Sequence, residues 1–243
     1  MNYGPLLFLG VFFTLITSWC GMVLVPQLQI GRLSQTNDVV DKSEVYPHAR
    51  PGQARQGAEV YRAYGCAECH TQQVRPKGLG ADLERGWGKR RSVANDFLYD
   101  QPAMLGNLRI GPDLANFGAR ETNRAKILLH LYNPQIGAPG SMMPPYKFLF
   151  AQRALKPGEK SSADALPLEG AYAAAPGQEN VARSAANELV EYLLSLHSDV
   201  YLFEVPPPYV PTNAAPAQPG ATNAPAVPDT NAPLKVPAES PAK

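Results

Sequence analysis

Apolar residues dominate the start of the chain, and the pattern then changes abruptly. In residues 6–25, 15 of 20 positions are apolar, and the first charged side chain is Arg32. As a helix, twenty residues span about 30 Å, which matches the hydrocarbon core of a bilayer. Thr14 and Thr17 interrupt the run, but their hydroxyls can bond back to the helix. The pattern predicts a transmembrane anchor over residues 1–31.

A cleaved signal peptide is the alternative interpretation of this segment. It would need a basic start, an apolar core of about 7–15 residues and a small-residue cleavage site. Residues 1–4 carry no basic side chain, the apolar run is longer than that, and Val25-Pro26-Gln27-Leu28 is a poor cleavage site. These features favour an uncleaved anchor.

Beyond the anchor, composition divides the chain into three further parts. Residues 32–52 are polar and contain Pro47 and Pro51, which indicates a stalk. Residues 53–205 hold the helical patterns and most other aromatic side chains, so we expect one folded domain there. Residues 206–243 contain 11 of the 25 prolines and almost no large apolar side chain. Such a Pro/Ala-rich tail buries too little to offset its chain entropy and is predicted to be disordered.

Within the domain the periodicity predicts a mainly α fold. Helices are expected at residues 53–64, 123–132 and 180–197, the last with apolar residues at helical spacing. No segment shows a convincing strand alternation. Glycine and proline punctuate residues 71–122, which should be mostly loop. A loop this long indicates that something other than secondary structure organises it.

Charge and cysteine content exclude two classes of protein. The chain has 22 basic and 21 acidic side chains, so it lacks the basic excess usual in nucleic-acid binders, and we expect no nucleic-acid partner. Its three cysteines are too few for a disulfide scaffold.

Two of the cysteines lie in Cys66-Ala67-Glu68-Cys69-His70, which matches C-x-x-C-H, the attachment signature of c-type haem. Two thiols three residues apart on one turn reach the two vinyl groups of the porphyrin, and the next residue presents its imidazole to iron. A structural zinc site needs four ligands, and a thioredoxin-like motif needs a βαβ setting. The motif predicts one covalent haem c, with His70 as an iron ligand. This haem would also organise the long loop.

An electron-carrying haem needs a second axial ligand, and a methionine loop offers one. Met143 is favoured because the loop of residues 140–146, rich in glycine and proline, can bring its thioether to iron. Met142 in the same loop stays open as an alternative. The other candidates are Met104, His48, His130 and His197. Of these, His130 is expected to be a partly exposed helix histidine.

Two further groups of residues are candidates for contacts around the haem. The turn Gly111-Pro112-Asp113-Leu114 offers backbone carbonyls, and we assign to Pro112 the one that accepts the Nδ1–H of His70. Such a bond fixes the imidazole and raises its donor strength. Arginines can pair with haem propionates. The candidates are Arg75 and Arg109, followed by Arg85, Arg90 and Arg91. For each of them a solvated surface charge is an equal alternative.

The chain carries further motifs that resemble those of a known family. Gly57-x-x-x-Tyr61-x-x-x-Gly65 before the C-x-x-C-H turn is similar to the opening of class I cytochromes c. More particular are the motifs Thr71-Gln72-Gln73-Val74-Arg75-Pro76, Glu84-Arg85, Ser92-Val93-Ala94, Phe97-Leu98-Tyr99-Asp100-Gln101-Pro102, Arg109-x-Gly111-Pro112-Asp113-Leu114-Ala115, His130-Leu131-x-Asn133-Pro134 and Met143-Pro144-x-Tyr146. Together, over residues 5–205, they resemble the membrane-anchored monohaem cytochrome c subunit of cbb3-type haem-copper oxidases, known as CcoO or FixO.

The resemblance implies a fold and an iron site. The fold would be mainly α, with a single N-terminal transmembrane helix and a class I cytochrome c-like haem domain with long loops. Cys66 and Cys69 carry over as thioether anchors, and His70 and Met143 carry over as axial ligands. We also expect the first and last helices of the domain to meet at Gly57, where glycine allows close approach.

The resemblance also implies a place in respiration. The anchor would sit against the catalytic haem-copper oxidase subunit in the bacterial inner membrane, with the haem domain in the periplasm. Electrons would arrive from a second cytochrome c subunit or a soluble cytochrome c and pass to the catalytic subunit. The chain itself would then have no catalytic centre.

Two other functions stay open. The cytochrome subunit of a nitric oxide reductase also has one helix and one haem domain, although the motifs between residues 75 and 115 argue against it. A haem sensor or peroxidase would require Met143 to leave the iron. Carbon monoxide binding to the reduced protein would distinguish a sensor or peroxidase from a six-coordinate electron carrier, which should resist it.

Overall fold

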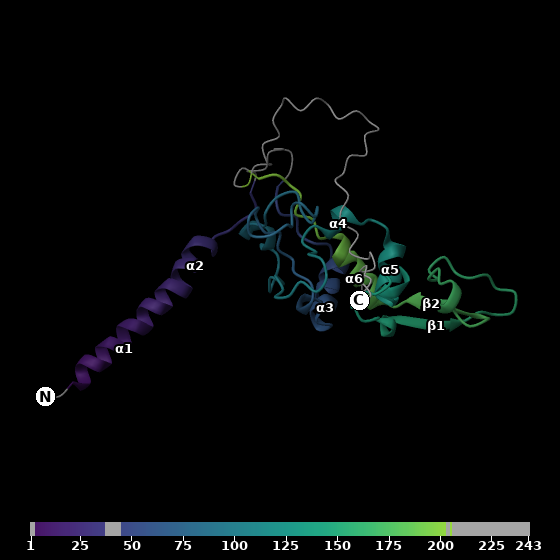
Figure 1. The fold of residues 1–243 in the computed structure, drawn as a ribbon, viewed down its shortest axis with the longest axis horizontal. Helices are drawn as coiled ribbons and strands as arrows, with labels where there is room; N and C mark the ends of the chain where they lie inside the picture. The colour runs from purple at the N-terminus through teal and green to yellow at the C-terminus, as the bar shows by residue number, and fades with distance from the viewer. Residues whose placement is uncertain (1–2, 37–44, 203–204, 206–243) are drawn as a thin grey trace, which may run out of the picture. The chain divides into compact units, whose positions relative to one another are not determined.

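The N-terminal apolar stretch forms one continuous helix in the computed structural model, which describes residues 3–36, 45–202 and 205 (Figure 1). It consists of α1 (Gly4–Trp19), a π-helical turn (Cys20–Leu24) and α2 (Val25–Ile30). These 27 residues are long and apolar enough to cross a membrane. At 1.5 Å per residue they extend about 40 Å, more than a hydrocarbon core requires.

Polar groups within this helix are satisfied by the helix itself. The hydroxyls of Thr14 and Thr17 donate to the carbonyl oxygens of Gly10 and Phe13, each at 2.8 Å. Pro26 lacks an N–H, and its ring would clash with the carbonyl four residues earlier in a regular helix. The backbone N–H of Val25 bonds the carbonyl of Cys20, five residues back, and this widened turn accommodates the proline.

Two helices form the centre of the folded domain. The helices α3 (Gly52–Ala63) and α6 (Ser184–Leu194) pack closely against each other (Figure 1). A Cβ on Gly57 would come closer than 3.0 Å to the backbone of α6, so only glycine permits this approach. The rings of Tyr61 and Tyr192, both buried, lie 5.3 Å apart across the contact. The predicted meeting of the first and last domain helices is confirmed.

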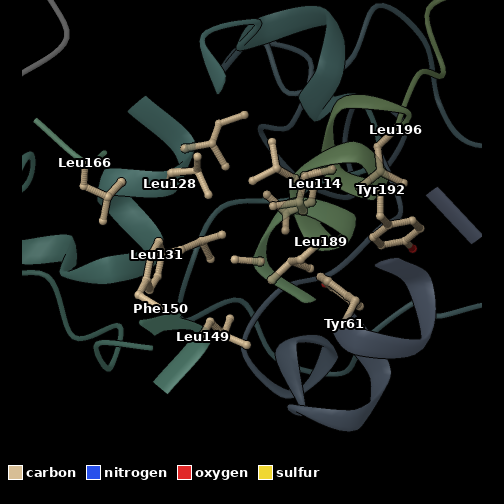
Figure 2. Packing of buried hydrophobic residues seen from close by; sticks show 14 residues of the cluster. Tyr61, Leu114, Leu128, Leu131, Leu149, Phe150, Leu166, Leu189, Tyr192 and Leu196 are labelled. Atoms are coloured by element: carbon tan, nitrogen blue, oxygen red, sulfur yellow. The ribbon is translucent and has the colours of Figure 1, made fainter. Parts of the chain in front are cut away.

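The remaining short elements extend this core. They are α4 (Phe117–Arg120) and α5 (Arg124–Tyr132), the latter capped by Asn123, whose side chain accepts a bond from the Lys126 N–H at 3.1 Å. Figure 2 shows how leucines from α5 and α6 gather with aromatic rings into one cluster. The buried members include Tyr61, Leu114, Leu128, Leu131, Leu149, Phe150, Leu189, Tyr192 and Leu196.

A small hairpin corrects the expectation that the domain has no strands. Strand β1 (Phe150–Ala154) pairs antiparallel with β2 (Gln178–Ala182). The last helix was expected from residue 180 but begins at Ser184, because residues 180–182 lie in β2. The cause is tertiary: the buried Glu179 carboxylate accepts bonds from Ser161 and Ser162, which are distant in sequence. Local periodicity carries no trace of such partners.

The long segment 71–122 is mostly loop, as predicted, with short helical turns at Ala94–Phe97 and Phe117–Arg120. A buried carboxylate ties its two halves together. Asp82 is fully buried and accepts a bond from the Arg75 backbone N–H at 2.7 Å and from the Arg109 guanidinium at 2.5 Å. The loop is thus held by the protein's own ion pairs.

A second set of contacts joins the expected stalk to this loop. Tyr46 is buried, and its hydroxyl donates to Asp96 at 2.7 Å. The fully buried Arg90 guanidinium binds the same carboxylate at 2.7 Å, and Arg50 pairs with Asp100. The stalk boundary at residue 52 stays a prediction, and the Pro/Ala-rich tail at 206–243 lies outside the described residues.

We predict that Gly57→Ala destabilises the domain by about 1–3 kcal/mol, because the added methyl forces α3 away from α6. Gly52→Ala is the matched control: it lies in the same helix with no atom within 4 Å of the added Cβ. The control should change the free energy of unfolding by less than about 1 kcal/mol, in the stabilising direction. Urea unfolding of the detergent-solubilised chain measures both, and equal effects would contradict the close packing.

We predict that Asp82→Asn lowers the free energy of unfolding by about 3 kcal/mol at neutral pH, because it leaves two arginines without their shared anion. Burial alone would raise the pKa of this carboxyl, but hydrogen bonds from Arg75 and Arg109 bring it below its usual value. A depressed pKa stabilises the fold above the unfolded value of about 4 and loses this contribution as pH falls.

The difference between wild type and Asp82→Asn should therefore shrink in acid. The exposed Asp164→Asn serves as the control and should alter stability little at any pH. If the unfolding free energies of wild type and Asp82→Asn differ as much in acid as at pH 7, the role assigned to the carboxylate is wrong.

Candidate haem-binding site

The C-x-x-C-H motif lies on a single tight turn directly after α3. Gly65 ends the helix with φ of 68°, a left-handed conformation that glycine adopts freely. The chain then forms a 3-10 turn, in which the backbone N–H groups of Cys69 and His70 both bond the carbonyl of Cys66, at 3.2 and 3.0 Å. The two thiols and the imidazole are therefore presented from one turn. Burial raises the pKa of the Cys66 thiol to about 11.

The His70 imidazole is oriented by the turn that the sequence singled out. Its Nδ1 lies 2.8 Å from the carbonyl oxygen of Pro112. Because a carbonyl only accepts, Nδ1 carries the proton and Nε2 keeps its lone pair. Burial lowers the pKa of His70, although the Pro112 carbonyl and the Asp113 charge oppose the shift. A neutral imidazole with a free Nε2 is the form that binds iron.

Two glycines allow the loop to lie on the motif. A Cβ on Gly111 would come closer than 3.0 Å to ring atoms of His70, and one on Gly106 would come equally close to the His70 carbonyl oxygen. Gly106 has φ of 75°, which also requires glycine. The backbone N–H of Gly111 bonds the Cys69 carbonyl at 3.0 Å. The segment around Gly111 is thus a cradle shaped for the imidazole.

The imidazole faces a cleft of about 320 Å³. His70 and Met143 both line it, although 73 positions separate them in sequence. Most of the wall is apolar, formed by Leu114, Phe117, Ile127, Leu129, Leu131 and Leu193. An apolar cleft with an imidazole and a thioether on its walls matches the donor set of a cytochrome c iron.

The two methionines of the loop differ in placement. Met143 is half-buried, packs against the core and lines the cleft. Met142 is 78% exposed and is absent from the cleft wall. Gln135 braces the loop, because its side chain donates to the Ser141 carbonyl at 2.6 Å and accepts from the Gly140 N–H at 2.8 Å. This placement supports Met143 over Met142.

The arginines proposed for the propionates already have protein partners. Arg75 and Arg109 meet on Asp82, and Arg109 also donates to the Gln73 carbonyl at 2.6 Å. Arg90 is engaged with Asp96. Contacts of Arg75 or Arg109 with a propionate stay predictions, and their ion pairs give them a structural role that the sequence did not reveal.

The sequence named His130 only as a less favoured ligand candidate and did not place it at the cleft. His130 is half-buried, as expected for a partly exposed helix residue, and it lines the cleft together with His70. A signal was available: Ile127, His130 and Leu131 are spaced i, i+3, i+4 on α5, and all three line the cleft.

The C-x-x-C-H turn, the oriented histidine and the methionine loop around one apolar cleft fit a single haem and define a mono-haem cytochrome. The family model for "Cytochrome C oxidase, mono-heme subunit/FixO" matches residues 4–197, and the chain belongs to this family. A comparison with curated proteins finds no match. As a member of the family, the chain is a haem-bearing oxidase subunit and works with the catalytic subunit. Membership favours this over the nitric oxide reductase alternative.

We predict that Gly111→Ala disturbs the haem site, because the methyl would occupy the space of the His70 ring. The control is Gly137→Ala, which also lines the cleft but meets no atom within 4 Å. Optical spectra of purified protein should show a shifted or partly high-spin haem in Gly111→Ala and a wild-type haem in Gly137→Ala. A wild-type spectrum in both variants would show that the space above Gly111 is not needed to position the His70 ring.

Proposed function

We propose that this chain carries single electrons to the catalytic subunit of a cbb3-type haem-copper oxidase through one covalent haem c. The observation that carries the proposal is that His70, on the Cys66–Cys69 turn, and Met143 line one apolar cleft. Cys66 and Cys69 hold the cofactor by thioether bonds, and His70 and Met143 ligate its iron. When bound, the haem supplies a one-electron iron couple.

The protein's residues set the conditions for that couple. The Pro112 carbonyl holds the His70 ring and strengthens it as a donor. A thioether from Met143 raises the potential relative to a second imidazole, and the apolar wall excludes water and further disfavours the ferric charge. Transfer of an electron through this haem does not require any side chain to move a proton or to react with a substrate. The chain therefore needs no catalytic centre of its own.

Membrane anchoring by Gly4–Ile30 completes the proposal. Covalent haem is attached outside the cytoplasm, so the domain faces the periplasm and the helix crosses the bacterial inner membrane once. Basic residues flank only the C-terminal side of the helix, which alone would favour the opposite orientation. The attachment chemistry outweighs that bias. The electron donor is a second cytochrome c subunit or a soluble cytochrome c.

The sensor or peroxidase alternative is less favoured by the structure. It needs a vacant iron position, whereas the Met143 loop is braced by Gln135 and tied to α5 by the bond from the Tyr146 N–H to the Leu131 carbonyl, at 2.9 Å. A fixed thioether suits an electron carrier.

The function is tested by purifying the oxidase through a tag on this chain. We predict that Cys66→Ser/Cys69→Ser abolishes haem staining of this subunit after denaturing electrophoresis. It should also reduce oxygen uptake driven by reduced cytochrome c to the background. Cys20→Ser, outside the motif, is the control and should retain both. Retained staining, or full oxygen uptake without this haem, would refute the proposal.

We predict that Met143→Leu removes the sulfur-to-iron absorption band of the oxidised protein, because leucine fills a similar volume without a thioether. Met142→Leu should keep the band and cost less than about 1.5 kcal/mol, as a near-isosteric change at an exposed position. Loss of the band in Met142→Leu alone would reverse the assignment. Persistence in both variants would assign the ligand elsewhere.

A further inference from the structure

His130 lines the same cleft as Met143 and His70. Both belong to the segment 124–146, which is closed on itself by two bonds at 2.9 Å: the Ala138 N–H to the Pro134 carbonyl, and the Tyr146 N–H to the Leu131 carbonyl. His70 belongs to a different segment, held by the turn after residue 110. The cleft therefore has one imidazole from each segment.

The His130 ring has no hydrogen-bond or ion-pair partner among the described residues of the chain. This distinguishes it from His70, which is bound to Pro112, and from His197, whose ring lies 3.8 Å from the Asp199 carboxylate. Burial is the main cause that lowers the pKa of His130, and electrostatic interactions with the His70 ring and with Lys126 act in the same direction. A neutral, half-buried imidazole without a protein partner, on the wall of an apolar cleft, is an available nitrogen donor.

His130 is positioned by its helix, independently of the methionine loop that carries Met143. α5 is anchored in the core by Ile127, Leu128 and Leu131, all buried. The methionine loop contains exposed residues 137–140 and Gly140 with φ of 85°. Loss of the thioether, by substitution or by partial unfolding of this braced loop, would leave the imidazole of α5 in place.

We infer that His130 is a reserve axial ligand, which takes the sixth position on the iron when the Met143 thioether is lost. The inference rests on the proposed haem function. In the exchange one iron–sulfur bond breaks and one iron–nitrogen bond forms. Both ligands are neutral, so no electron or proton is gained or lost. The site stays six-coordinate and closed to small ligands, while the potential falls because imidazole stabilises ferric iron more than thioether does.

The test uses the full chain, purified in detergent with its haem. Met143→Ala should lose the sulfur-to-iron band yet keep the low-spin spectrum of two imidazole ligands. Met143→Ala/His130→Gln should become high-spin. Because an internal ligand competes with an added one, carbon monoxide affinity of the reduced single variant should be at least about tenfold weaker than that of the double variant. Met143→Ala/His197→Gln is the matched control and should behave like the single variant.

A high-spin Met143→Ala with the same carbon monoxide affinity as the double variant would overturn the inference. If Met143→Ala does not fold, mild urea that removes the sulfur-to-iron band from the otherwise unaltered protein gives a second test. The product should be low-spin with His130 present and high-spin in His130→Gln, and a low-spin product in both would also overturn it. Absence of the band in wild type would instead refute the proposed ligand set, so the two failures are distinguishable.

Discussion

The hydrogen bonds of the Asp113 carboxylate are the contacts on which the geometry of the site depends most. The carboxylate accepts bonds from the Thr71 hydroxyl at 2.6 Å, the Gln73 N–H at 2.8 Å and the Ala115 N–H at 2.9 Å. These bonds hold the end of the long loop against the residues that directly follow His70. The preceding residue, Pro112, is thereby placed with its carbonyl at the imidazole. A buried carboxylate with several backbone donors is rigid, since any displacement would leave a charge unpaired in the interior.

Other buried carboxylates hold together the long segment 71–122, which has little secondary structure. Asp82 binds Arg75 from the first half of the loop and Arg109 from the second, and Asp96 binds Arg90 and, from before the loop, Tyr46. Each carboxylate joins parts of the chain that no helix or strand connects. The haem expected from the sequence would add to these ties.

The packing of α3 on α6 gives the motif turn a firm base. Gly57 lets the helices approach, and Tyr61 and Tyr192 fill the contact. Since the C-x-x-C-H turn follows α3 within three residues, its orientation is inherited from this packing. α5 and its methionine loop supply a further part of the cleft lining. The apolar cleft expected to hold the haem of this oxidase subunit is thus lined by two parts of the domain. One is the motif turn after α3, and the other is α5 with its methionine loop.

The sequence alone determined what depends on local pattern: the apolar helix, the C-x-x-C-H turn, the Pro112 turn and the two main domain helices. It missed the hairpin and the true start of α6, because Glu179 and its partners are distant in sequence. It also could not separate Met142 from Met143 by geometry, or place His130 on the cleft wall. Those outcomes depend on which side chains face one space, and only tertiary packing decides that, because neighbours in a cleft are set by contacts between segments and not by spacing along one.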